Sequence, residues 1–177
     1  PRTPSRLTRF AWLAIAAALV AGVTAPSSSG IGGGGFVLAW DAEKRAPFII
    51  DFRETAPAGI DGDAFDRRPF PPEERGRLVG VPGEVHGLFE LHRRAGKLRW
   101  ADLVGRAERQ ARLGFVVGPH LANSLRYSSS ALAGQPAFAA LYYPGGTPAP
   151  VGTRIVNTRL AQTLARILDV PFTMADA

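Results

Sequence analysis

The chain has 177 residues, of which 46% are apolar, and a mean hydropathy of +0.01, which is typical of one globular domain rather than of a disordered segment. Its net charge is +6, but the arginines are scattered and form no basic run interleaved with aromatic residues, so we expect no nucleic-acid partner. The absence of cysteine excludes disulfides and thiol catalysis, and three histidines without ligand-pair spacing predict no metal and no cofactor.

The amino end combines a basic segment, PRTPSRLTR, with an apolar one, FAWLAIAAALVAGV. This order is typical of a secretory signal, and it is equally typical of a buried, alanine-rich helix. The apolar run is shorter than the roughly 20 residues that a membrane span needs. We expect a helix over residues 7–23, followed by a turn-forming segment over residues 24–35.

A glycine-rich stretch, GIGGGG, follows at residues 30–35. Gly30, Gly32 and Gly35 match the spacing of a dinucleotide-binding loop. Such a loop leaves a strand and opens a helix, whereas here the predicted helix comes first and a predicted strand follows. No phosphate-binding lysine follows the glycines either. The stretch therefore predicts a tight turn into a strand, or a backbone floor beside a pocket, and no nucleotide site.

Two apolar runs, FVLAW at residues 36–40 and FIIDF at residues 48–52, flank a short polar connector and predict a β-hairpin. Their nearly continuous apolar character favours strands that are covered on both faces. Residues 56–83 are rich in proline, glycine and charge, which is typical of a long exposed loop.

The rest of the chain is predicted to be mainly helical, over residues 84–95, 100–113 and 157–168, with a shorter helix that begins near Pro119. Gly114 is expected to end the second of these helices. The residues expected to face inward are Val85, Leu88, Phe89 and His92 in the first helix, Leu103, Ala107 and Ala111 in the second, and Leu160, Leu164 and Ile167 in the last. The order of helix, hairpin, loop and helices favours an α+β fold.

One arginine stands at a position suited to binding. In IIDFRETAPAG, residues 49–59, Arg53 comes just after an apolar strand, where a strand end meets the rim of a pocket. Its planar guanidinium can bind a carboxylate with two charge-assisted hydrogen bonds. The alternative is a structural ion pair with Asp51 or Glu54, and the residues alone leave both readings open.

Four blocks in this order resemble the large subunit of gamma-glutamyltranspeptidases, which are amino-terminal-nucleophile hydrolases. The blocks are PSSSGIGGGGFVLAW, DFRETAPAG, VGVPGEVHGLFELHRRAGKLRWADL and ARLGFVV. The resemblance runs from about Leu13 to Leu168, so we divide the chain into an atypical basic segment, 1–12, and a partial large-subunit domain, 13–177. It implies that the α+β fold is the large-subunit portion of an αββα sandwich.

The resemblance also implies a chemistry. Members of the family are made as one precursor that cleaves itself, and the new amino-terminal threonine of the small subunit attacks a γ-glutamyl amide such as that of glutathione. The glutamyl group then passes to water, an amino acid or a peptide. The DFRETAP match assigns Arg53 to the α-carboxylate of the γ-glutamyl group, with Asp51 and Glu54 as supporting residues. The pocket-adjacent backbone would be Gly32, Gly33, Gly34 and Gly35, and VPGEVHG, including Glu84, would have a structural role at a helix start.

Two departures from the family pattern limit what we expect of this chain. No threonine stands in a Thr-Thr-His-like context, so we expect the nucleophile in a partner small subunit and expect this chain alone to be inactive. The family's GGNAVDAA-like segment is replaced by residues 1–12, yet the match over LAIAAALVAGVTAP favours a buried helix over a signal.

Two alternative functions and the location stay open. The chain could be a fragment of a glutaryl-type cephalosporin acylase, which shares the fold and the use of an arginine, or a non-catalytic remnant domain. The family favours a periplasmic or extracellular location, because many relatives are periplasmic or surface-bound, and a cytoplasmic one remains open.

Overall fold

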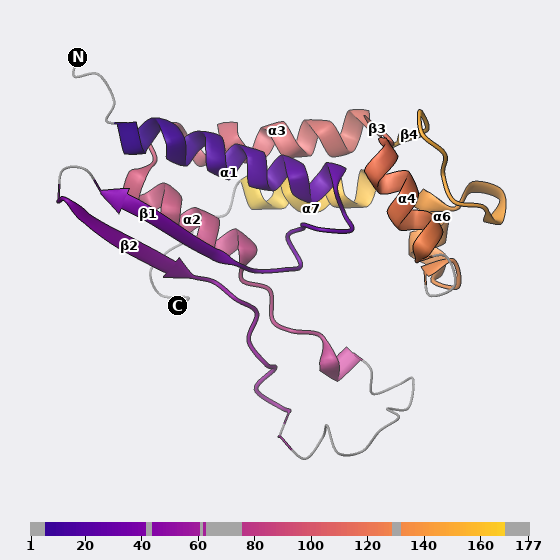
Figure 1. The fold of residues 1–177 in the computed structure, drawn as a ribbon, viewed down its shortest axis with the longest axis horizontal. Coiled ribbons are helices and arrows are strands. Elements are labelled where there is room, and N and C mark those ends of the chain that lie inside the picture. Colours follow the sequence, from indigo (N-terminus) through magenta and orange to yellow (C-terminus); the bar gives the residue numbers. More distant parts are fainter. Residues whose placement is uncertain (1–5, 42–43, 61, 63–75, 129–131, 169–177) are drawn as a thin grey trace. The chain divides into compact units, whose positions relative to one another are not determined.

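The computed structural model describes residues 6–41, 44–60, 62, 76–128 and 132–168, which belong to two compact units (Figure 1). The first unit contains residues 31–96 with the beginning of the chain, and the second contains residues 12–30 and 97–177. Helix α1 (Arg6–Thr24) contributes residues to both units. Helices and short antiparallel strands occur together, in agreement with the predicted α+β class.

The strands of the first unit form the predicted hairpin. Strand β1 (Phe36–Asp41) pairs antiparallel with β2 (Ala46–Asp51), and their register places Leu38 opposite Ile49. The apolar runs supplied residues of high strand propensity, and the polar connector supplied the turn. The prediction is confirmed, with strand ends that differ by one or two residues from those expected.

One face of this hairpin is exposed. Helix α2 (Glu84–Ala95) packs against both strands, and Ile50 is buried. Successive side chains of a strand point to opposite faces, so the residues of the other parity share the second face. These residues, which we call the apolar hairpin face, are 58–74% exposed: Phe36, Leu38, Trp40 and Ile49. The expectation that both faces are covered is therefore wrong for the described residues, because α2 covers only one of them.

The stripe predicted for helix α2 is only partly confirmed. Leu88 is buried, and Val85, Phe89 and His92 are half-buried, whereas the other fully buried residues are Gly87, Leu91 and Ala95. The ring of Phe52 lies where a side chain at position 87 would be, and the helix therefore presents its glycine side to the hairpin. Apolar periodicity alone did not locate this side, because a glycine adds no hydrophobic signal.

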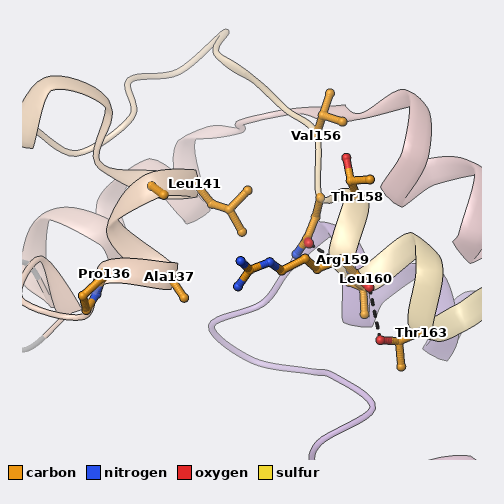
Figure 2. A pocket seen from close by; sticks show the side chains of 10 residues that line it. Pro136, Ala137, Leu141, Val156, Thr158, Arg159, Leu160 and Thr163 are labelled. Carbon is orange, nitrogen blue, oxygen red and sulfur yellow. Dashed lines mark hydrogen bonds between the residues drawn. The ribbon is translucent and has the colours of Figure 1, made fainter.

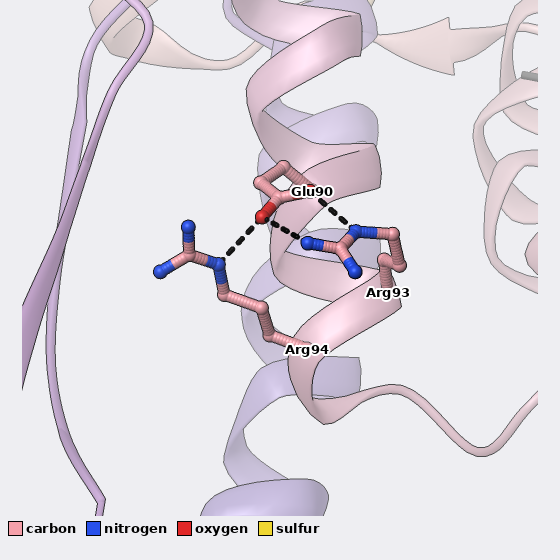
Figure 3. A network of polar contacts seen from close by, with 3 residues as sticks. All are labelled: Glu90, Arg93 and Arg94. Carbon is pink, nitrogen blue, oxygen red and sulfur yellow. Dashed lines mark hydrogen bonds and ion pairs between the residues drawn. The ribbon is translucent and has the colours of Figure 1, made fainter. Parts of the chain in front are cut away.

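A polar network on α2 links the helix to the hairpin (Figure 3). The carboxylate of Glu90 accepts hydrogen bonds from Arg93 at 2.7 and 2.9 Å and from Arg94 at 2.6 Å. These arginine hydrogen bonds lower the pKa of Glu90 to about 2. The guanidinium of Arg94 also lies 5.5 Å from the ring centroid of Phe48 in β2, which is within the range of a cation–π contact.

The second unit is built around two helices that lie side by side, α3 (Trp100–Leu113) and α7 (Thr158–Leu168) (Figure 1). Ala107, Ala111 and Leu164 are fully buried, and the short alanine side chains allow close packing. The indole Nε1 of Trp100 donates a hydrogen bond to the carbonyl oxygen of Ile167 at 3.2 Å. The inward residues predicted for α3 are confirmed.

In α7 the predicted stripe is only partly confirmed. Ala161 and Leu164 are buried, whereas Leu160 and Ile167 are half-buried. Asn157 precedes the helix, and its side-chain oxygen accepts a hydrogen bond from the backbone amide of Leu160 at 3.0 Å, which caps the first turn.

Short elements connect α3 to α7. Gly114 has φ +85°, a conformation that favours glycine, and it ends α3 as predicted. The elements that follow are β3 (Phe115–Val116) paired with β4 (Arg154–Ile155), α4 (Pro119–Tyr127), α6 (Pro136–Tyr142) and the 3₁₀ turn η3 (Pro144–Gly146). The helix expected near Pro119 is thus confirmed.

The remaining predictions concern α1 and the long loop. Helix α1 buries Ile15, Leu19 and Val23 at a spacing of four, so the predicted helix over residues 7–23 is confirmed. None of the helices in the described part of the chain is long and apolar enough to cross a membrane. Half of the predicted loop, residues 61 and 63–75, lies outside the described residues. Near its two ends the Val81 amide donates to the Thr55 carbonyl at 2.9 Å.

Candidate functional site

Arg53 is the residue at which the backbone leaves the pairing of strand β2. Phe52 still pairs with Gly35: its amide donates to the Gly35 carbonyl at 3.0 Å, and its carbonyl accepts from the Gly35 amide at 3.3 Å. The next amide, that of Arg53, donates instead to Oδ1 of Asp51 at 3.0 Å. Aspartate commonly forms such a turn with the amide two residues ahead. Asp51 therefore orients the backbone of Arg53 as the chain leaves the strand.

The Arg53 side chain is loosely held. Its Nε lies 3.6 Å from Oε2 of Glu54, and its guanidinium carbon lies 6.0 Å from the ring centroid of Phe36 on the apolar hairpin face. The side chain is 60% exposed. A pair at this distance is an ion pair beyond ordinary hydrogen-bond length, and exposed pairs of this kind stabilise a fold very little. The guanidinium is therefore free to bind another carboxylate at little cost to the fold.

Three of the four predicted glycines lie against the residues around Arg53. The Gly33 carbonyl accepts hydrogen bonds from the amides of Gly83 and Glu84, both at 3.0 Å. Gly35 pairs with Phe52, and a Cβ built on Gly34 would lie 2.9 Å from the backbone nitrogen of Glu54. Gly32 is exposed, and a Cβ there would have no atom within 4 Å.

A second carboxylate, Glu84, belongs to the same group of residues. It occupies the first turn of α2, where a helix dipole would favour the charged form. Burial nevertheless raises its pKa, and the nearby charge of Glu54 raises it further. From the sequence, Glu84 was expected only to have a structural role at a helix start. Thirty positions separate the two glutamates, so no spacing rule could have paired them.

A cavity lined by described residues lies in the second unit (Figure 2). It has a volume of about 760 Å³ and lies between α6 and the start of α7, with Arg159 extending across it toward α6. Its lining contains none of the predicted site residues. Nor does the described part of the chain contain a group of three histidine, aspartate or glutamate side chains that could hold a metal ion.

The sequence of this chain is similar to known proteins of one family. The sequence model of the gamma-glutamyltranspeptidase family matches residues 13–173. Scoloptoxin SSD14 of Scolopendra dehaani is 38% identical over 156 residues, which are 87% of this chain and 27% of the relative. Glutathione hydrolase 7 of Rattus norvegicus is also 38% identical, over 85% of this chain and 22% of its own length. The chain thus spans about a quarter of the length of these curated relatives.

Solved structures support the same grouping. Gamma-glutamyltranspeptidase from Pseudomonas nitroreducens has a TM-score of 0.75 at 28% identity, over 96% of this chain and 54% of that one. Cephalosporin acylase from Bacillus halodurans has a TM-score of 0.75 at 25% identity, over 89% of this chain and 31% of that one. These likenesses confirm the predicted amino-terminal-nucleophile hydrolase fold. Because the family match covers almost the whole sequence, this chain belongs to the gamma-glutamyltranspeptidase family.

Proposed function

We propose that this chain is part of the large subunit of an enzyme that hydrolyses or transfers γ-glutamyl groups, and that Arg53 binds the α-carboxylate of the substrate. Glutathione is the representative donor, and water, an amino acid or a peptide is the acceptor. The observation that carries the proposal is the position of Arg53 at a strand end and the weak pairing of its guanidinium, in a chain of this family. Arg53 follows the end of β2 and its side chain is 60% exposed; among the described residues its guanidinium faces Glu54 in a long ion pair and the Phe36 ring at 6.0 Å.

The roles of the neighbouring residues follow from their contacts. Asp51 holds the backbone of Arg53 through the 3.0 Å hydrogen bond to its amide. Glu54 balances the guanidinium charge before substrate arrives, and the substrate carboxylate then replaces it as the closer partner. Both carboxylates act as supporting residues, and neither would touch the bond that breaks.

The nucleophile of the proposed reaction lies elsewhere. No two threonines are adjacent in this sequence, so it has no Thr-Thr-His-like start. We therefore assign the attacking threonine to a small subunit that completes the pocket, and the chain alone is expected to have no activity. The apolar hairpin face supports the need for a further segment, because four large side chains on one face are more than half exposed.

A direct test uses the complete gene product and Arg53→Ala. Loss of two charge-assisted hydrogen bonds is expected to cost about 2–3 kcal/mol, or roughly a 30- to 150-fold rise in KM for γ-glutamyl-p-nitroanilide. Arg53→Lys retains the charge but loses the planar guanidinium that makes two hydrogen bonds. Its KM should therefore lie between those of the wild type and the alanine variant. A KM that is unchanged in the alanine variant would remove Arg53 from the site.

A second candidate is a glutaryl-type acylase, because the Bacillus halodurans cephalosporin acylase has the same fold at a TM-score of 0.75. The two activities separate on one pair of substrates, γ-glutamyl-p-nitroanilide and glutaryl-p-nitroanilide, since only the first carries an α-amino group. Faster turnover of the glutaryl compound would establish the acylase. No turnover of either compound would establish a non-catalytic remnant.

A further inference from the structure

Two glycines lie close to the backbone of Phe52, the residue before Arg53. A Cβ built on Gly34 would overlap the carbonyl oxygen of Phe52, and so would a Cβ built on Gly83. The Gly83 Cβ would also lie 2.8 Å from the carbonyl carbon of Phe52 and 3.4 Å from the carbonyl oxygen of Arg53. Real Cβ atoms essentially never lie within 3.0 Å of such an atom. Both positions therefore require the absence of a side chain.

The requirement is for space rather than for an unusual backbone. Gly83 has φ −108°, which any residue can adopt, and Gly34 is not among the residues of positive φ. What the two glycines share is a close approach to one carbonyl oxygen, that of Phe52. Gly34 belongs to the turn before β1, and Gly83 precedes α2.

Hydrogen bonds join these two segments to each other and to the strand end. The Gly33 carbonyl accepts from the amides of Gly83 and Glu84, both at 3.0 Å, and Phe52 pairs with Gly35 in both directions. Backbone atoms of residues 33–35, 52 and 83–84 thus lie close together. A bulkier residue at position 34 or 83 would separate them by moving the Phe52 carbonyl.

Glu54 also lies close to Gly34. A Cβ on Gly34 would lie 2.9 Å from the backbone nitrogen of Glu54 and 3.0 Å from its Oε2, the oxygen that pairs with Arg53. The residue before Arg53 and the residue after it therefore both lie close to Gly34, where a side chain would displace them. Arg53 lies between these two residues, so a shift of either one moves the backbone from which its side chain extends.

We propose that Gly34 and Gly83 are positioning residues for Arg53: by letting two backbone segments approach the Phe52 carbonyl, they direct the guanidinium to the substrate carboxylate. This inference rests on the proposed function of Arg53. A carboxylate anchor contacts the substrate in the ground state and the transition state alike, so its misplacement should raise KM and leave kcat nearly unchanged.

The test compares Gly34→Ala and Gly83→Ala in the complete gene product with Gly59→Ala as a matched control. Gly59 lies in the same unit, has no positive φ, and its added Cβ would meet nothing within 4 Å. We expect KM for γ-glutamyl-p-nitroanilide to rise about tenfold in the first two variants, with kcat within about twofold, and neither to change in the control.

A second substrate separates positioning from general damage. 4-Aminobutyryl-p-nitroanilide lacks the α-carboxylate, so its slow turnover should not change in Gly34→Ala or Gly83→Ala if these glycines act through Arg53. An equal loss on both substrates would overturn the inference. If neither alanine variant folds, Gly35→Ala replaces them. Its Cβ would lie 3.3 Å from the end of the Phe52 ring, so we expect a smaller rise in KM, and no rise would count against the inference.

Hydrogen exchange distinguishes failure of this inference from failure of the proposed function. The peptide containing residues 52–54 should exchange faster in Gly34→Ala and Gly83→Ala than in the wild type and Gly59→Ala. If Arg53→Ala raises KM but the two glycine variants change neither KM nor exchange, the positioning role is wrong and the proposed function stands. If Arg53→Ala leaves KM unchanged, the proposed function fails, and the positioning role fails with it.

Discussion

Helices α2 and α3 each contain an interior glycine, and the two glycines have opposite surroundings: one is tightly packed and the other has open space beside it. A Cβ on Gly87 of α2 would overlap the ring of Phe52 and lie 2.5 Å from its Cβ, whereas a Cβ on Gly105 of α3 would have only Leu168 nearby, at 3.8 Å. The first-turn acids differ as well: the pKa of Glu84 in α2 is raised, and that of Asp102 in α3 is lowered. A tertiary contact thus requires the glycine of α2, whereas no neighbour requires the glycine of α3.

The largest effect is expected for Gly87→Ala. Alanine is favoured over glycine in a helix by about 1 kcal/mol, but overpacking against the Phe52 ring should reverse the sign. We expect a net loss of about 2 kcal/mol in the free energy of unfolding. Thermal unfolding of the complete gene product measures it, and an increase in Tm would show that Phe52 moves away freely.

The matched change in α3, Gly105→Ala, should have the opposite sign. The new methyl group meets ordinary van der Waals space, so the gain in helix propensity of about 1 kcal/mol should be retained. The same unfolding measurement applies. A lower Tm here, together with a lower Tm for Gly87→Ala, would abolish the contrast between the two helices.

A smaller effect should come from Glu90 of α2. Its pKa is lowered to about 2 by hydrogen bonds from Arg93 and Arg94, so the folded state binds its proton more weakly than the unfolded state does. The resulting stability is present above pH 4.5 and is lost as pH falls toward 2. Glu90→Gln should therefore lower the free energy of unfolding at pH 7 by less than about 1 kcal/mol, since solvent screens the pair. Denaturant unfolding from pH 2 to 7 measures it; a deficit that persists at pH 2 would point to lost packing.

The smallest effects should come from the first-turn acids. Because burial raises the pKa of Glu84, the neutral carboxyl stabilises the fold below pH 4.5, and this contribution is lost as pH rises through the raised value. Glu84→Gln should thus raise stability at pH 7. Asp102 is the control: hydrogen bonds from Arg99 lower its pKa, so Asp102→Asn should lower stability at pH 7 and have no effect in acid. Shifts of the same sign at pH 7 would contradict this reasoning.

The sequence predicted what depends on local pattern. Apolar spacing located α3 with Leu103, Ala107 and Ala111 inward, and a strand followed by arginine located Arg53 at the end of the hairpin. Neither the buried side of α2 nor the approach of Glu84 to Glu54 could be predicted. Both depend on Phe52 and on the Gly33–Gly83 hydrogen bond, which joins residues fifty positions apart, and periodicity carries no information on such contacts.

The apolar hairpin face has a consequence for handling the protein. Among the described residues β1 and β2 pair only with each other, so both outer edges offer unpaired backbone groups next to four large exposed side chains. A polypeptide made as residues 1–177 alone is therefore expected to aggregate through strand-edge pairing, and mild detergent should reduce its sedimentation. Co-production with the proposed small subunit should give soluble material without detergent.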